Sequence, residues 1–239
     1  MDLDGTRVVV LGGTSGIGLA VARAALSAGA EVVVASSRSG SVAKALAELG
    51  DGASGDVVDL LDAATTRQFL AGVGPFDHLV YTAGEALTMM PLDALEIDRA
   101  RDFFQVRYFG ALTAVQAARP LLRPGGSITL TSGTAGERPG PGWAVPASLC
   151  GATNSMTRAL AVELAPLRVN AVAPGVVRSP LWSSMSEEQR ERFYADLGAA
   201  LPVGRVGEVD DIARAYLFCM TEPFATGSVF TVDGGAVLV

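Results

Sequence analysis

Three glycines near the N-terminus have the spacing of a loop that binds phosphate. They lie in the segment Gly12-Gly13-Thr14-Ser15-Gly16-Ile17-Gly18, which follows an apolar run over 7–11 and opens a helical pattern over 16–28. Gly12 permits a tight turn, Gly16 lets the backbone approach a pyrophosphate, and Gly18 lets the helix pack on the strand, while the helix N-terminus offers its N–H groups. The whole segment predicts a dinucleotide site, with a glycine turn that binds nothing as the alternative.

The residues after the second apolar run favour one of the two nicotinamide dinucleotides. An NAD site usually has an Asp or Glu there, which accepts hydrogen bonds from the ribose hydroxyls. This chain has Ser36-Ser37-Arg38 instead. The guanidinium of Arg38 can pair with a 2′-phosphate. NADP(H) is therefore favoured over NAD(H), with a merely solvated loop arginine as the alternative.

The elements that must position these residues alternate between strand and helix. Apolar strand patterns cover 7–11, 31–35, 57–58, 77–81, 127–131, 168–173 and 229–232, and helical patterns cover 16–28, 40–49, 63–71, 93–118, 144–164, 186–200 and 209–220. The alternation predicts one α/β domain over 1–239, with a doubly wound parallel sheet, helices on both faces and ligands at the carboxyl ends of the strands. The longest insertion, 179–207, is expected to be a lid.

Composition and charge exclude several classes of function. The 239 residues are 49% hydrophobic and carry a net charge of −7, so we expect a large core and no nucleic-acid partner. There is no apolar run of about 18 residues, so no membrane span is expected. The acidic start, Met1-Asp2-Leu3-Asp4, is unlike a signal peptide, which predicts a cytoplasmic protein.

Residue counts limit the possible chemistry further. The chain has two cysteines, Cys150 and Cys219, and one histidine, His78. These numbers predict no disulfide framework and no metal site, and they argue against a Ser-His-Asp triad. Lys44 is the sole lysine. Any mechanism that needs a lysine must therefore use Lys44 or do without one.

Several motifs together make the chain resemble the short-chain dehydrogenases/reductases over its whole length. The matching segments are Gly12-x3-Gly16-Ile17-Gly18, Asp59-Leu60, Ala83-Gly84, Arg168-Val169-Asn170-Ala171-Val172-Ala173-Pro174-Gly175, Arg205-Val206-Gly207-Glu208, Thr226-Gly227 and Val232-Asp233-Gly234-Gly235. The resemblance implies a seven-stranded Rossmann sheet and a homodimer or homotetramer packed through the helices at 93–118 and 144–164. It also implies adenine contacts from Asp59 and Leu60, and cofactor contacts from Ala83, Gly84 and the loop from Pro174 and Gly175 to Val177.

The positions that carry the family's chemistry are replaced. That chemistry uses Asn, Ser, Tyr and Lys, with a Tyr-x3-Lys spacing. Four residues after the four tyrosines lie Glu85, Leu112, Gly198 and Met220, so the motif is absent. Counting from the matched segments puts Gly133, Pro146 and Cys150 at the Ser, Tyr and Lys positions and Arg107 at the Asn position. The family's Asn-Asn-Ala-Gly reads Tyr81-Thr82-Ala83-Gly84.

Three side chains could replace the missing chemistry. Arg107 is always charged and could polarise a carbonyl or bind a carboxylate, unless it is only a helix arginine paired with an acid. Glu85, just after Ala83-Gly84, could serve as an acid or base, unless it is a solvated loop residue. Ser132 adjoins the lost serine position, although the alternation of a strand can turn its side chain to the other face.

Other candidates concern the substrate and the core. Trp143 and Trp182 lie before the 144–164 helix and in the expected lid, and either could wall an apolar substrate pocket, with ordinary packing as the alternative. We interpret His78 as structural. Cys150 is interpreted as a small buried residue, with a reactive thiol as the alternative.

The sequence supports three hypotheses about function. The first is an NADP(H)-dependent oxidoreductase with a non-standard site, which reduces a small apolar substrate such as an activated alkene, an iminium or a polarised carbonyl. The second is a cofactor-binding protein without catalysis. The third is a non-redox enzyme, a cyclase or isomerase, that reuses the pocket.

Overall fold

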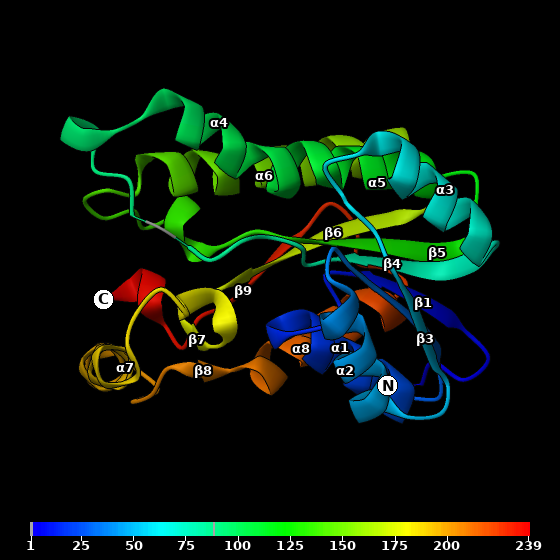
Figure 1. Cartoon of the computed structure of the whole chain (residues 1–239), viewed down its shortest axis with the longest axis horizontal. Helices are drawn as coiled ribbons and strands as arrows, with labels where there is room; N and C mark the ends of the chain where they lie inside the picture. The colour runs from blue at the N-terminus through cyan, green and yellow to red at the C-terminus, as the bar shows by residue number, and fades with distance from the viewer. Residues whose placement is uncertain (1, 88) are drawn as a thin grey trace.

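Seven parallel strands form the central sheet of the structure, a computed structural model that describes residues 2–87 and 89–239 (Figure 1). They are β1 (Arg7–Leu11), β2 (Glu31–Ser36), β3 (Ala53–Val57), β4 (Phe76–Tyr81), β5 (Leu122–Thr131), β6 (Arg168–Pro174) and β9 (Val229–Val232). Their spatial order is β3-β2-β1-β4-β5-β6-β9. The chain builds outward from β1 in one direction and then from β4 in the other. The direction therefore switches between β1 and β4, where such sheets bind their ligands.

Helices cover both faces of the sheet (Figure 1). One layer holds α3 (Ala63–Val73), α4 (Ile97–Phe104), α5 (Ala111–Ala118) and α6 (Ala144–Glu163), and the other holds α1 (Gly16–Ser27), α2 (Ser39–Leu49) and α8 (Val209–Thr221). Side chains of β1 alternate between the two cores: Val9 and Leu11 join one buried cluster, and Val8 and Val10 join the other. The predicted doubly wound seven-stranded Rossmann sheet is confirmed.

The expected lid contains one α-helix and a short 3-10 helix, Pro180–Trp182, and its two ends are joined by strand pairing. Within it lies α7 (Glu187–Ala200), whose start is fixed by a reciprocal capping box between Ser186 and Gln189. The two ends of the segment meet as a short parallel pair, β7 (Val177–Arg178) with β8 (Gly207–Glu208). Figure 1 shows α7, β7 and β8 together beside the C-terminus, apart from the two helical layers.

One predicted helix differs from the structure. The pattern over 93–118 predicts a single helix, but a π-helical stretch, Gln105–Gly110, separates α4 from α5; we call it the π segment. The Tyr81 hydroxyl donates a hydrogen bond to the Val106 carbonyl there, at 2.5 Å. A side chain inserted against a helix commonly produces such an irregularity. The apolar periodicity of the sequence did not reveal it, because the inserted side chain comes from β4.

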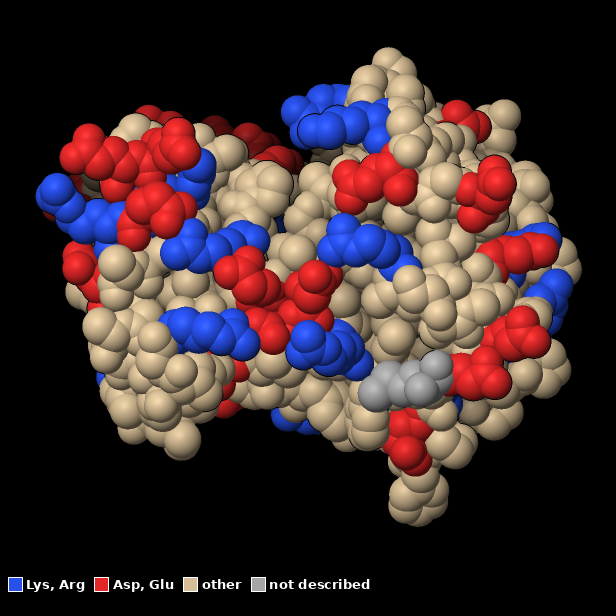
Figure 2. All heavy atoms as spheres, turned by 90° about the horizontal axis from the view of Figure 1, so that it is seen from below, with Lys and Arg blue, Asp and Glu red and all other residues tan. Residues whose placement is uncertain are grey.

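Charges of both signs are interleaved on the face that carries α1, α2 and α8 (Figure 2). There Arg23 of α1 makes ion pairs with Glu48 of α2, at 3.3 Å, and with Asp210 of α8, at 2.6 Å. In residues 2–87 and 89–239, no helix is both long enough and apolar enough to cross a membrane. Over the same residues, no three His, Cys, Asp or Glu side chains form a group that could hold a metal ion.

His78 is expected to make stability depend on acid pH. It is 5% exposed in β4, with Nδ1 2.9 Å from the Ser127 hydroxyl, and burial lowers its pKa from 6.5 to about 4. As the pH falls, the His78 ring therefore binds a proton near pH 6.5 in the unfolded chain but only near pH 4 in the folded protein. The free energy of unfolding should fall by about 3 kcal/mol as pH drops through this window.

Because the chain has one histidine, the titration of His78 can be measured directly. Its ring gives one NMR signal to titrate, and denaturant unfolding at several pH values gives the stability. In His78→Gln the dependence between pH 6.5 and 4 should flatten, although carboxylates still titrate at the acid end. A ring titration midpoint near the ordinary value would contradict the assignment.

Candidate active site

The glycine loop lies at the switch between β1 and β4. Gly12 has a φ of +88°, and a Cβ added there would lie 2.6 Å from the backbone nitrogen of Ala83, just beyond β4. A Cβ on Gly18 would overlap the carbonyl oxygen of Gly12. The loop, the first turn of α1 and the end of β4 therefore pack backbone against backbone, which side chains at these two positions would prevent.

The start of α1 offers donors in a form that suits phosphate. Ser15, the N-cap residue, makes no side-chain capping hydrogen bond, so the side chain that usually satisfies the first N–H groups leaves them available. Gly16 has a φ of +52°, and a Cβ there would meet Pro180 at 3.4 Å and Ser179 at 3.7 Å. The beginning of the expected lid thus lies over the glycine loop. This cradle fits the pyrophosphate of a dinucleotide.

The other expected cofactor residues lie at the same edge of the sheet. Ser36 ends β2, and Ser37 and Arg38 follow it as exposed residues. Within the part of the chain that the structure describes, Arg38 forms no ion pair. Its guanidinium is therefore available to a ligand at the carboxyl end of β2.

The residues expected to contact the cofactor after β3 and β6 differ in how exposed they are. Asp59 is exposed and accepts a hydrogen bond from the Leu61 amide at 3.0 Å, whereas Leu60 is 7% exposed and belongs to the core. Pro174 is the last residue of β6, and Gly175 follows it. Val177 is 4% exposed and its side chain packs in the cluster that contains Val8 and Val10, so only its backbone is left for a ligand. Contacts of these residues with a cofactor stay predictions.

Arg107 belongs to the π segment, and its guanidinium packs against the residues that follow β4. A Cβ added to Gly84 would overlap its guanidinium, Nη2 donates a hydrogen bond to the Glu85 carbonyl, and the guanidinium lies 4.8 Å from the centre of the Phe103 ring. Among the described residues, its buried Nε has no hydrogen-bond partner. Burial lowers the pKa of Arg107 and the nearby Glu85 carboxylate opposes this, yet an arginine keeps its charge in proteins.

The positions expected to replace Ser and Lys meet in space. A Cβ added to Gly133 would lie 3.3 Å from the Sγ of Cys150. Pro146 is buried in the first turn of α6, where a proline is tolerated because no helical partner needs its N–H. Burial raises the pKa of the Cys150 thiol, so it stays protonated near neutral pH. None of these three groups is therefore a charged substitute for the family's lysine.

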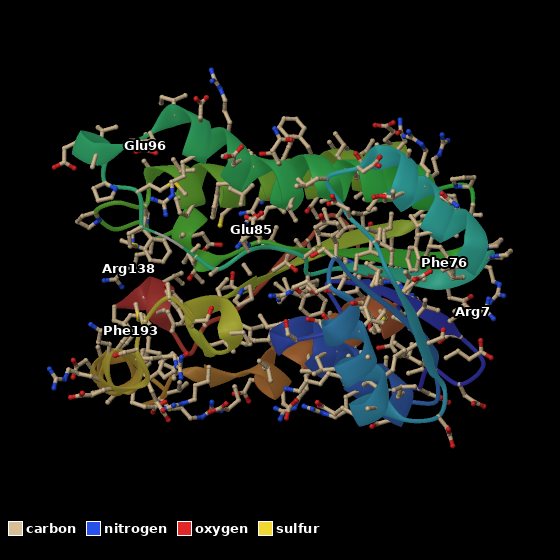
Figure 3. The ribbon with its side chains drawn as sticks, viewed as in Figure 1. Arg7, Phe76, Glu85, Glu96, Arg138 and Phe193 are labelled. Carbon is tan, nitrogen blue, oxygen red and sulfur yellow. The ribbon has the colours of Figure 1, made fainter. Side chains whose placement is uncertain are left out.

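Ser132 and Glu85 differ in how far they are engaged. The Ser132 hydroxyl lies 2.6 Å from Oδ1 of Asn154 and 3.3 Å from the Cys150 carbonyl, and it thus ties β5 to α6. Glu85 is exposed, and Figure 3 places it between the sheet and the layer that holds α4. The negative charge of Glu85 raises the pKa of Arg107, against the effect of burial. Catalysis by either residue remains a prediction.

The two tryptophans pack at one hydrophobic cluster, whose buried members all come from the segment 179–207. Trp182 is 6% exposed and its indole N–H donates to the Val177 carbonyl at 3.1 Å. Trp143, Leu87 and Phe193, which is labelled in Figure 3, are partly buried and pack against the cluster that contains Trp182. The Leu87 amide donates to the Leu181 carbonyl at 3.1 Å. The segment 179–207 therefore contacts the chain at Leu87, after β4, and Trp182 is largely occupied with packing. Its role as a lid stays a prediction.

Two residues that contribute to the site were not identified from the sequence. Tyr81 contacts the π segment beside Arg107, and Oδ1 of Asn154 accepts a hydrogen bond from the Ser132 hydroxyl. The signal for Tyr81 was present, since Tyr81 and Thr82 replace the two asparagines of a motif whose Ala83-Gly84 match. Asn154 carried no comparable signal, because an isolated polar residue in a helix is ordinary.

Comparison with known proteins agrees with this geometry. Residues 12–237 match the family model for enoyl-(acyl carrier protein) reductase. The short-chain dehydrogenase/reductase ucsE of an Acremonium species is 36% identical, over 99% of this chain and 97% of its own. A small-chain dehydrogenase solved in complex with NADPH is 37% identical, with a TM-score of 0.87 over 99% of this chain and 100% of its own.

A third protein of similar structure is named for two activities. The reductase/Diels-Alderase MalC of Malbranchea aurantiaca is 30% identical, with a TM-score of 0.92 over 99% of this chain and 98% of its own.

Proposed function

Because the chain belongs to the short-chain dehydrogenase/reductase family, whose members it matches over nearly its whole length, we propose that it is an NADPH-dependent reductase that works without that family's tyrosine–lysine pair. The similar proteins support an oxidoreductase of this family. The choice of NADPH is supported by Arg38, and by the NADPH complex of a similar protein. The unusual site is supported by Gly133, Pro146 and Cys150.

One observation carries the proposal. Ala83 packs against Gly12 of the phosphate-binding loop, and the next residue, Gly84, packs against the guanidinium of Arg107. A cradle for the dinucleotide and a fixed positive charge therefore meet at two adjacent residues beyond β4. Such a charge, held in place before reaction, stabilises negative charge that develops nearby.

The residues of the chain define which substrates this site can serve. When bound, NADPH supplies a hydride. The N–H groups at the start of α1 hold the phosphates, and Arg107 stabilises negative charge on the substrate without giving up a proton. Pro146 has no proton to donate, and the Cys150 thiol has a raised pKa. We therefore propose a substrate that needs no proton from the protein during hydride transfer. An activated alkene or a polarised carbonyl such as a quinone delocalises the new negative charge, whereas an iminium is neutralised by the hydride to an amine.

The direct test is a substrate panel. Purified protein is given NADPH with a cyclic enone, a naphthoquinone or a cyclic iminium, and loss of NADPH absorbance is followed. Oxidation that depends on both the protein and the substrate supports the proposal. If NADPH binds tightly and no class is reduced, the protein binds the cofactor without this reductase chemistry.

Cofactor preference is expected to depend on Arg38. NADPH should bind at least tenfold more tightly than NADH, because a charge-assisted contact with the 2′-phosphate contributes about 1.5–3 kcal/mol. Arg38→Ala should weaken NADPH binding by about the same factor and leave NADH unchanged. Titration of both nucleotides against both proteins measures this, with Arg99→Ala on α4 as a matched loss of charge elsewhere. Equal affinities of the wild type for the two nucleotides would contradict it.

A second candidate function is a cyclisation without net redox change. The observation in its favour is the similarity to MalC, which is described as both a reductase and a Diels-Alderase. In that case Arg107 would polarise a substrate that reacts with itself. A product that forms with NADP⁺ as well as with NADPH, and with no NADPH consumed, distinguishes this function from reduction.

A further inference from the structure

Tyr81 stands at the first of the two asparagines in the family's Asn-Asn-Ala-Gly motif, and its hydroxyl has a specific partner. The side chain is 3% exposed at the carboxyl end of β4 and donates a hydrogen bond to the Val106 carbonyl at 2.5 Å. Val106 directly precedes Arg107 in the π segment. Burial raises the pKa of the Tyr81 hydroxyl, which therefore keeps the proton that it donates.

The π segment is shaped to receive this hydroxyl. A Cβ added to Gly110 would lie 2.6 Å from the Tyr81 hydroxyl oxygen and 3.4 Å from the Gln105 carbonyl. The helix can therefore approach Tyr81 only because residue 110 has no side chain. A π-helical turn contains more residues than an α-helical turn, so it changes the direction in which its side chains leave the helix. Tyr81 and Gly110 together thus affect where Arg107 points.

The end of β4 then holds Arg107 at two places. Tyr81 binds the backbone that carries the arginine, and the Glu85 carbonyl, four residues further along the same segment, accepts from its guanidinium. We propose that Tyr81 is a positioning residue: through the Val106 carbonyl it sets the place of the Arg107 guanidinium in the site. This inference rests on the proposed function for the catalytic value of that position, but not for the position itself.

The first test needs no substrate. Tyr81→Phe removes the hydroxyl and keeps the ring. Tyr216→Phe is the matched control, because Tyr216 is fully buried in α8 and its hydroxyl, 2.6 Å from that of Thr131, does not touch the π segment. Arginine labelling by phenylglyoxal is followed at each site by peptide mass spectrometry. The exposed Arg101 of α4 serves as the internal reference.

The expected result is site-specific. In Tyr81→Phe, labelling of Arg107 should be about tenfold faster than in the wild type, as for the loss of an ordinary hydrogen bond, and amide exchange over 105–110 should be faster too. Arg101 should be unchanged, and Tyr216→Phe should resemble the wild type at Arg107. Unchanged labelling of Arg107 in Tyr81→Phe, or an equal increase in both variants, overturns the proposal.

A kinetic cycle links the position to turnover. With a substrate that the wild type reduces, Tyr81→Phe should lower kcat about tenfold, but should have little further effect in an Arg107→Ala background, because both changes act through one group. Simple multiplication of the two effects would contradict action through Arg107. If Arg107→Ala keeps full turnover, the proposed catalytic role fails, whereas the labelling experiment still decides the positioning.

Discussion

Replacing Arg107 by alanine is expected to lower kcat and kcat/KM together by about 10²-fold. The guanidinium is fixed by Gly84, Phe103 and the Glu85 carbonyl, and its buried Nε has no partner among the described residues. A charge held in this way acts mainly on the negative charge of the transition state, and the loss of one such donor typically costs this much. Steady-state kinetics with NADPH and a reducible substrate measures the change.

Two companion variants separate catalysis from folding. Arg107→Lys should recover only part of the activity, since a compact ammonium lacks the planar fork of donors. Arg101→Ala removes an exposed arginine from the same helical stretch and should leave turnover unchanged. NADPH affinity should change far less than kcat. A folded Arg107→Ala protein with unchanged kcat would remove the catalytic assignment.

The second large effect is expected at Gly18. A methyl group there would overlap the Gly12 carbonyl oxygen and the Thr82 hydroxyl, and the first of these is backbone that cannot turn away. Gly18→Ala should therefore push α1 away from the loop, lowering the free energy of unfolding by about 1–3 kcal/mol. It should also weaken NADPH binding more than tenfold, because the N–H groups of α1 leave the cradle.

The chain provides a matched control for this change. Gly72 is a helical glycine of α3 that has nothing within 4 Å of an added Cβ. Gly72→Ala should be neutral or stabilising by up to about 1 kcal/mol, since alanine is the better helix former, and should leave NADPH binding unchanged. Denaturant unfolding and nucleotide titration of both variants test the pair. Wild-type NADPH affinity in Gly18→Ala would show that the packing of α1 does not position the loop.

The sequence determined the features that depend on short segments of chain. Apolar runs such as Val8 to Leu11 must be buried on both faces of a sheet, and their alternation with helical patterns leaves few topologies. The glycine loop was recognisable because its conformation needs residues without a Cβ at fixed spacing. The sequence also predicts that the catalytic positions are replaced, since matched segments on either side set the count of residues to Gly133, Pro146 and Cys150, and this stays a prediction.

Only the tertiary structure decided how the chemically important side chains are held. The break in the 93–118 helix includes Val106, whose carbonyl accepts from Tyr81, 25 residues earlier in the chain, and Arg107 donates to a carbonyl 22 residues away. Trp143 and Trp182 pack in the same cluster because the segment 179–207 contacts the chain at Leu87, after β4. Periodicity reveals which face of an element is buried but not which distant atom meets it. Contacts between distant segments form only when the sheet brings its strand ends to one edge.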